Sequence, residues 1–355
     1  MTDRRVAPLS SLFLTGRLRV ELNQWRNSTR DANLSQESDE PVNTLNELYS
    51  SLNARRRYEV WFIRLGLSDG AGAWWFRYLL MNPGRNGCAH DPGGMPVQVW
   101  VTWFPRDGKA QSFIQGFPLE GLSLSAKGQN PFHFQIGHNE IGEASCQGKL
   151  EVEGRTISWG LHYRSAFRVT LSNKGWIGFS RTPHSNAVFS GQITLDGRSF
   201  EGEPLGFGVQ GHNCGYRHRK FWTWTHAHFP RAGTSHSTLE ALVYEMPFGL
   251  LFRKAVLWHE GEEHEFRNLQ EIRRDSNEFA WNFRSSPKGG FQLEAAIDGT
   301  GPSIHHLPYL KTDCTGSFEV TNNSLARVVL LLKRPGRPVE TLETATGAVL
   351  EMAGR

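Results

Sequence analysis

The sequence has 355 residues, which is enough for about two domains with sizeable apolar cores. Its 39 Lys and Arg residues against 35 Asp and Glu residues leave a dispersed net charge of +4, which does not favour nucleic-acid binding. No window approaches the roughly 20 apolar residues of a membrane span, and the apolar stretch at 12–14 is too short for a signal-peptide core. We therefore expect a soluble, cytoplasmic protein with no nucleic-acid partner and no transmembrane segment.

Aromatic and turn-forming residues dominate the composition. The 12 Trp and 22 Phe residues fit the pleated surface of a sheet and the walls of large apolar cavities. The 37 Gly and 17 Pro residues supply the turns that many short strands require. The composition therefore predicts an all-β protein.

The four cysteines lie far apart in the sequence and form no Cys-x-x-Cys pair: Cys88, Cys146, Cys214 and Cys314. A disulfide framework needs a higher density of cysteines than this. The sequence therefore favours free thiols in a reducing compartment, in agreement with a cytoplasmic location.

Residues 1–54 differ from the rest of the chain and are expected to form an N-terminal extension. The segment 26–40 is rich in Ser, Asn, Asp and Glu, which is typical of a loop. Leu45, Leu48 and Leu52 then follow at helical spacing, so one short helix is predicted over 44–52.

Strand-like runs separated by turn sequences fill the chain after residue 55. In the first half the runs are 58–63, 73–80, 97–104, 148–152, 156–163, 191–195 and 199–201. In the second half they are 221–229, 238–245, 250–259, 265–271, 278–283, 291–297, 316–321 and 326–332. Turn signals at this spacing predict antiparallel meanders and not alternating strands and helices.

A glycine-rich segment divides these runs into two sets. Residues 202–215 hold five glycines and few strand formers, which places the domain junction near residue 205. Long antiparallel sheets avoid exposed edges by closing on themselves, and a barrel of about eight strands has room for one small ligand. We expect two tandem antiparallel β-barrels, at residues 55–205 and 206–355.

The segment 211–229 carries the strongest functional pattern. The turn Gly211-His212-Asn213-Cys214-Gly215 precedes a strand that places two indoles and two imidazoles on one face. The four residues of this face are Trp222, Trp224, His226 and His228. Indoles can stack on a flat or polyene ligand, and an imidazole with a pKa near neutrality can act as a general acid or base. The candidate catalytic residues are therefore His212, Asn213, His226 and His228.

Structural roles for the same residues stay open. Trp at alternating strand positions is commonly core packing. His212 and Asn213, which lie between glycines, could equally satisfy buried backbone groups at a sharp turn.

The Gly-His-Asn-x-Gly turn and the Trp-x-Trp strand resemble the signature region of a lipocalin-like superfamily. This superfamily contains hydroxyneurosporene synthase (carotenoid 1,2-hydratase), AttH-type proteins and tocopherol cyclase, whose members often carry Asn-Trp-Gly where this chain has Cys214 in place of Trp. Three further segments follow in the expected order: Tyr58-Glu59-Val60-Trp61 with Trp75-Phe76-Arg77-Tyr78, then Thr156-Ile157-Ser158-Trp159, then Gly347-Ala348-Val349-Leu350-Glu351.

The resemblance implies two lipocalin-like (calycin) barrels and an apolar ligand of isoprenoid, polyene or quinone type. It also implies enzymes that hydrate or isomerise a double bond, or close a ring, without a metal or an organic cofactor. Indole faces would stabilise a carbocation-like transition state in such a cavity. The first-half motifs add four candidate ligand-binding residues to Trp222 and Trp224: Glu59, Trp61, Trp75 and Arg77.

Other functions stay open on the same residues. A barrel can carry a lipophilic ligand without transforming it, because fold does not imply function. His226-x-His228 places two imidazoles on one strand face, and His212 or Cys214 could complete a metal site. Trp rings in an open groove could instead stack on sugars.

Overall fold

The computed structural model describes residues 45–354 except 89–91, 126–128, 130, 174–177, 231–235, 273–278 and 288. The predicted loop at 26–40 therefore lies outside the described residues. None of the helices among the described residues is long and apolar enough to cross a membrane.

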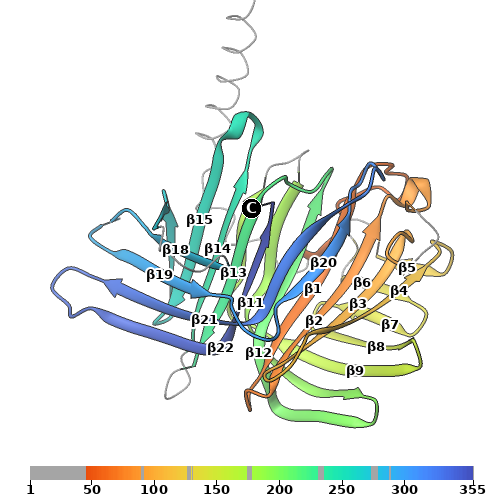
Figure 1. Cartoon of the computed structure of the whole chain (residues 1–355), viewed down its shortest axis with the longest axis horizontal. Helices are drawn as coiled ribbons and strands as arrows, with labels where there is room; N and C mark the ends of the chain where they lie inside the picture. Colours follow the sequence, from red (N-terminus) through yellow and green to blue (C-terminus); the bar gives the residue numbers. More distant parts are fainter. Residues whose placement is uncertain are drawn as a thin grey trace, which may run out of the picture. The chain divides into compact units, whose positions relative to one another are not determined.

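The first sheet has 12 strands in the order β4-β3-β2-β1-β12-β11-β9-β8-β7-β6-β5, with β10 paired to β11 (Figure 1). Its strands are β1 (Tyr58–Leu67), β2 (Gly72–Met81), β3 (Val97–Pro105), β4 (Gln111–Phe117), β5 (Leu122–Leu124), β6 (His133–Ile136), β7 (Asn139–Gly142), β8 (Ser145–Val152), β9 (Arg155–Arg164), β10 (Val169–Asn173), β11 (Gly178–Leu195) and β12 (Arg198–Gly215). A 3₁₀ helix, η2 (Pro83–Arg85), follows β2.

The second sheet has 10 strands in the order β16-β15-β14-β13-β22-β21-β19-β18-β17, with β20 paired to β21. Its strands are β13 (Trp222–Phe229), β14 (Ser237–Glu245), β15 (Leu251–His259), β16 (Glu262–Arg267), β17 (Gln270–Glu271), β18 (Ala280–Arg284), β19 (Gln292–Asp298), β20 (His305–Leu310), β21 (Ser317–Lys333) and β22 (Glu340–Ala353). A second 3₁₀ helix, η4 (Pro247–Gly249), joins β14 to β15. Strands β13–β16 and β18–β22 repeat the order of β1–β4 and β8–β12, so the two sheets are built on one plan.

Two curled antiparallel sheets confirm the predicted all-β class and the meander-like succession of strands. The predicted junction at residue 205 falls inside β12, which carries the first sheet to Gly215, and the second sheet begins at Trp222. The limits of the two domains stay a prediction.

The helix predicted over 44–52 is wrong for most of its length. Only Leu45 and Asn46 are helical among the described residues of this segment. The backbone N–H groups of Tyr49 and Ser50 each donate to the Glu59 carboxylate at 2.7 Å. These bonds to β1 replace the bonds that a helix would make, so tertiary contacts override the leucine spacing.

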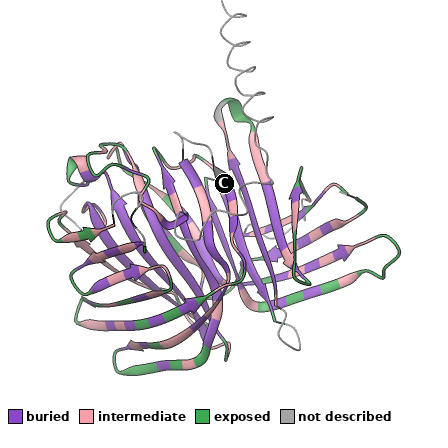
Figure 2. Ribbon diagram, turned by 180° about the vertical axis from the view of Figure 1, so that it is seen from behind, coloured by how far each residue is buried: buried purple, intermediate pink, exposed green. Residues whose placement is uncertain are grey.

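The apolar core forms four clusters, of which the smallest joins Trp100 of the first sheet to Tyr309 of the second. One cluster fills the inside of the first sheet and a second fills the inside of the second sheet. A third cluster lies between the sheets and joins Phe62 and Trp75 to Trp224 and Tyr244. Strands β1 and β2 are therefore buried on both faces, whereas β9 at the periphery alternates between buried and exposed residues (Figure 2).

Arg64 ties the two sheets together. Its side chain on β1 is fully buried and donates to the carbonyl oxygens of Ser324, Thr346, Gly347 and Ala348 in the second sheet. Burial lowers the pKa of Arg64 to about 9, because a charge loses its hydration there. The guanidinium fork replaces this hydration with several carbonyl groups at once, which a lysine ammonium cannot match in geometry.

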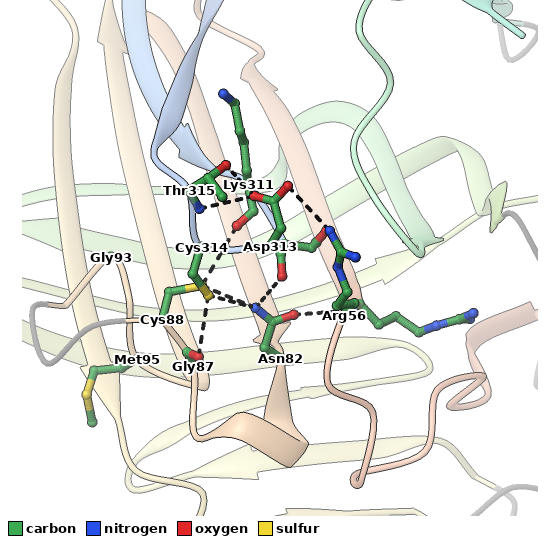
Figure 3. Close-up of a disulfide and its surroundings, with 12 residues drawn as sticks. Arg56, Asn82, Gly87, Cys88, Gly93, Met95, Lys311, Asp313, Cys314 and Thr315 are labelled. Atoms are coloured by element: carbon green, nitrogen blue, oxygen red, sulfur yellow. Dashed lines mark hydrogen bonds and ion pairs between the residues drawn. A yellow bond between two sulfur atoms is a disulfide. The ribbon is translucent and has the colours of Figure 1, made fainter. Parts of the chain in front are cut away.

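A disulfide joins the same two sheets at one end (Figure 3). It links Cys88, between β2 and β3, to Cys314, between β20 and β21, across 226 residues of sequence. Asn82 lies beside it and donates from Nδ2 to the Thr312 carbonyl at 2.9 Å. The expectation of free thiols is wrong for this pair, because folding brings two distant cysteines together, and it is confirmed for the buried Cys146 and Cys214. The cytoplasmic location stays a prediction.

Arg64→Met is expected to lower the free energy of unfolding by about 3–5 kcal/mol, because it leaves buried carbonyls without their donor. Urea denaturation measures this change. Arg106→Met, on an exposed turn, is the control and should change stability by less than about 0.5 kcal/mol. A loss of less than about 1 kcal/mol in Arg64→Met would contradict the role given to Arg64.

Replacing Cys88 and Cys314 together by Ser is expected to lower the free energy of unfolding by about 2–5 kcal/mol, because the disulfide closes a long loop in the unfolded chain. Denaturant unfolding with and without dithiothreitol measures this. The reductant should destabilise the wild-type protein and leave the double variant unchanged. Equal sensitivity of both proteins to the reductant would show that the pair is not bonded.

Candidate active site between the two sheets

A cavity of about 130 Å³ lies where the outer faces of the two sheets meet. Eight of the 21 residues of its wall are aromatic: Tyr58, Phe62, Trp75, Phe179, Trp222, Trp224, Tyr244 and Tyr309. Its polar side chains are Arg77, Ser172, Ser180, Asn213, Cys214, Arg217, His218, Arg219 and Glu351. An apolar wall with a few convergent polar groups is the usual form of a small-molecule site.

Residues 211–215, expected as a turn, are the end of strand β12, where pairing with β1 keeps them extended, and their glycines make room for aromatic rings of β1. A Cβ atom at Gly211 would collide with the Phe62 ring, and one at Gly215 would lie 2.8 Å from the Tyr58 ring. The two glycines thus let β1 side chains lie directly on the backbone of β12. The rings of Phe62 and Tyr58 occupy the space that side chains at Gly211 and Gly215 would need, and both rings belong to the cavity wall.

Glu351, near the end of β22, is the buried acid of the cavity. Its Oε1 accepts a hydrogen bond from Trp222 Nε1 at 2.9 Å, and its Oε2 accepts weaker ones from Tyr309 and Asn322 at 3.4 and 3.5 Å. Burial raises the pKa of Glu351, although Arg77 and these donors partly oppose the rise. The carboxyl therefore holds its proton to a higher pH than an exposed glutamate does.

Arg77, on β2, supplies a cation to the same wall. Its guanidinium lies 4.4 Å from the ring centre of Tyr309 and 4.8 Å from that of Trp100. Its Nη1 is buried and has no hydrogen-bond partner among the described residues. Stacking on two rings thus holds the guanidinium in place and leaves its Nη1 available to donate a hydrogen bond.

Tyr58, Cys214, His218 and Asn213 are uncharged polar groups of the wall. Burial raises the pKa of Tyr58 to about 12 and also raises the pKa of the Cys214 thiol to about 12. Burial, with the charge of Arg77, lowers the pKa of His218 to about 3. The Oδ1 atom of Asn213 is buried without a hydrogen-bond partner among the described residues, so it is free to accept a bond from a ligand.

Five of the ten residues predicted from the sequence line this cavity: Trp75, Arg77, Asn213, Trp222 and Trp224. Sequence alternation had placed the Trp face of β13 inside a barrel. The structure places it between the two sheets, where Trp224 meets the Phe62 ring edge-on at 5.6 Å.

His212, Glu59 and Trp61 lie beside the cavity and fasten the segment 45–50 to the first sheet. His212 Nδ1 lies 2.7 Å from the Leu45 carbonyl oxygen, and its Nε2 lies 2.9 Å from Glu59 Oε1. Burial by itself raises the pKa of Glu59, but the His212 contact and the N–H donors of Ser50 and Tyr49 outweigh it and lower the pKa. Trp61 stacks on His212 at 4.7 Å.

His226 and His228 are also buried outside the cavity wall. His226 Nε2 lies 2.6 Å from the Ser185 carbonyl oxygen, and the His228 ring stacks on Phe207 at 4.6 Å. Burial lowers the pKa of His226 to about 3 and lowers that of His228 well below its usual range. Neither imidazole therefore has the pKa near neutrality that the sequence suggested. Their catalytic role stays a prediction.

The metal site considered for His212, His226 and His228 is not formed, because their ring nitrogens do not belong to any group of described residues close enough to hold an ion. Among the described residues, one group of possible ligands has its atoms within 4.8 Å of one another: His259, Glu260 and Glu340. Arg334 contacts both of these carboxylates, at 2.8 Å from Glu260 and 3.3 Å from Glu340. Arg337 also lies 3.7 Å from Glu260, so two cations already face the two carboxylates.

Glu240 is a second buried acid, next to Trp224. It accepts hydrogen bonds from Thr182 at 2.8 Å, from Ser185 at 3.1 Å and from Trp224 Nε1 at 3.3 Å. Burial raises its pKa to about 7, against the effect of these donors. Its oxygens point at first-sheet hydroxyls, so Glu240 links the two sheets instead of lining the cavity.

The sequence did not single out Tyr58, His218, Tyr309 and Glu351 as site residues. Tyr58 and Glu351 belong to segments that carried the family resemblance, which is the signal that could have found them. Glu351 meets Trp222 across 129 positions of sequence, so no local pattern shows that they bond.

The fold and the cavity define a class of proteins with two tandem antiparallel sheets and a ligand-sized space. No protein-family profile and no curated protein sequence matches the chain significantly. CghA with Sch210972 is similar in structure, with a TM-score of 0.59 at 11% identity over 84% of this chain and 88% of that chain.

Two further solved structures share the fold. A putative AttH from Nitrosomonas europaea has a TM-score of 0.50 at 13% identity, over 86% of this chain and 94% of that chain. Kievitone hydratase from Nectria haematococca has a TM-score of 0.50 at 11% identity, over 88% and 94%. The predicted resemblance to the lipocalin-like, AttH-type proteins is thus confirmed for the fold.

Glu240→Gln is expected to stabilise the protein at high pH. The folded pKa of about 7 lies above the usual 4.5, so the wild-type fold loses stability as the pH rises through this window. The variant should exceed the wild type by on the order of 3 kcal/mol at pH 8.5 and by less than about 1 kcal/mol at pH 5. Urea unfolding at both pH values measures this, and a difference independent of pH would contradict it.

Proposed function

We propose that the cavity binds an apolar, unsaturated small molecule and that Glu351 moves a proton on it, in a hydration, isomerisation or cyclisation. One observation carries this proposal: a buried carboxyl group with a raised pKa lies in a cavity wall that includes eight aromatic rings. Buried carboxyls in clefts with such a shift are characteristic of general acids.

The chemistry follows from the groups around Glu351. The protonated carboxyl donates its proton to one carbon of a double bond, which leaves positive charge on the substrate. The faces of Trp75, Trp222 and Trp224 stabilise that charge. Addition of water and loss of its proton completes a hydration, loss of a neighbouring proton completes an isomerisation, and attack by a second double bond closes a ring.

Arg77 assists the proton transfer from Glu351. Its charge lowers the pKa of Glu351, so it stabilises the carboxylate that remains after the proton has left. Glu351 can then take a proton back from the product. Asn213 Oδ1 is a suitable acceptor for the attacking water. The hydratase named among the structures of this fold is consistent with this scheme.

A non-catalytic carrier is the second candidate. The three donors on Glu351 already satisfy its oxygens, as expected if the residue only supports the cavity wall. Turnover therefore decides between the two functions, and ligand binding does not.

The first experiment is native mass spectrometry of the purified protein, with organic extraction and metal analysis of the same sample. We expect a co-purifying lipophile, which then serves as the assay compound. Glu351→Gln should lower its turnover by about 100-fold or more, because the proton donor is lost, and should change affinity by less than about threefold. Wild-type turnover should fall on the alkaline side, as the pH rises past the raised pKa of Glu351.

Glu240→Gln is the matched control, because it changes another buried carboxyl outside the cavity wall. It should keep turnover within about threefold. His226→Ala and His228→Ala test the role predicted from the sequence. If either lost turnover with intact affinity while Glu351→Gln stayed active, the proton donor would be a histidine. Unaltered ligand after prolonged incubation would support the carrier.

A further inference from the structure

A large open basin of about 1170 Å³ adjoins the cavity. Its wall includes Thr312 and Asp313 from the β20–β21 connection beside the disulfide, together with Met352, Ala353 and Gly354 at the end of β22. Figure 3 shows Lys311, Asp313 and Arg56 on this side of the disulfide. The disulfide thus holds one rim of the basin in place.

The basin is strongly cationic. Five Arg or Lys side chains line it against two carboxylates: Arg56, Arg217, Arg219, Lys220 and Lys311 against Asp313 and Glu319. Both acids are already paired, Asp313 with Arg56 at 3.4 Å and Glu319 with His306 at 3.0 Å. Among the described residues no carboxylate lies within ion-pair distance of the other four cations.

The basin and the cavity share part of their walls. Arg217, His218 and Arg219, in the connection between β12 and β13, line both. His218 is packed between the rings of Tyr58 at 4.0 Å and Phe318 at 5.2 Å. Arg219 stacks on Tyr244 at 4.7 Å. One molecule can therefore contact the aromatic wall of the cavity and the charged wall of the basin together.

We propose that the basin is an anion subsite, which holds an acidic group of the same small molecule whose apolar part enters the cavity. The substrate class is then an amphipathic anion: an unsaturated, ring-containing or polyene body with a carboxylate, phosphate or similar group. This proposal rests on the proposed function, and it adds that Arg217, Lys220 and Lys311, which form no ion pair among the described residues, select for negative charge. Like-sized neutral molecules would bind more weakly.

Two fluorescent probes of nearly the same shape test the subsite: anilinonaphthalene sulfonate, which is anionic, and phenylnaphthylamine, which is neutral. The full chain is titrated with each. The variant combines Lys220→Gln with Lys311→Gln, two residues that line the basin and not the cavity. We expect it to weaken sulfonate binding about tenfold or more and neutral binding less than twofold. Raising the salt from 50 to 500 mM should weaken sulfonate binding to the wild type and have less effect on the variant.

The matched control is Arg106→Gln with Lys109→Gln, which removes the same charge from an exposed turn whose residues do not line the basin. It should leave both probes unchanged. Equal weakening of both probes by the basin variant, or no selective loss of the sulfonate, would overturn the subsite. Failure of the neutral probe to bind, with selective sulfonate binding retained, would overturn the apolar cavity and keep the anion subsite.

Discussion

The burial of both faces of the central strands is the constraint on which the rest of this structure depends. Each sheet fills its inner face with its own core, but β1 and β2 also carry large apolar side chains on the outer face. Those side chains require a second apolar surface, which β13, β14 and β22 supply. Trp75 and Trp224 meet there with ring centres 6.3 Å apart. Each sheet therefore stabilises the other.

The large rings and buried polar groups of this interface do not fill it completely. The space left between them is the cavity of the candidate site. Rings packed at steep angles leave a gap between them, and the gap is closed at its ends by hydrogen-bonded groups such as Glu351 with Trp222. Arg64 and the disulfide hold the sheets on either side. A fixed separation between the sheets then keeps the cavity open without a ligand to support it, which is a form of preorganisation.

The connection between the sheets has a chemical role as well as a topological one. The residues between Gly215 and Trp222 leave the first sheet and enter the second, so they must pass the end of the interface. There Arg217, His218 and Arg219 line both the cavity and the basin, and the two arginines make the shared wall cationic. The same segment separates the two motifs that made the strongest sequence pattern. Those motifs therefore indicated the right place, although not the groups that lie in it.

Strand alternation and turn spacing were sufficient to predict antiparallel sheets, because both depend on neighbours within a few residues. They also grouped Trp222 and Trp224 on one face, which the structure retains. They did not show which space that face meets, since period two defines two faces and both are buried here. The short helix failed for a related reason, because Glu59 captures the backbone of Tyr49 and Ser50.

The sequence by itself determined the class of the fold and the face that Trp222 and Trp224 share. The tertiary structure alone decided the partners of the polar groups. His212 and Glu59 are 153 positions apart, and Cys88 and Cys314 are 226 apart. The raised pKa of Glu351 likewise arises from burial by residues of both sheets. Such long-range contacts leave no local periodicity, so only the folded chain reveals which charges are buried, paired or free.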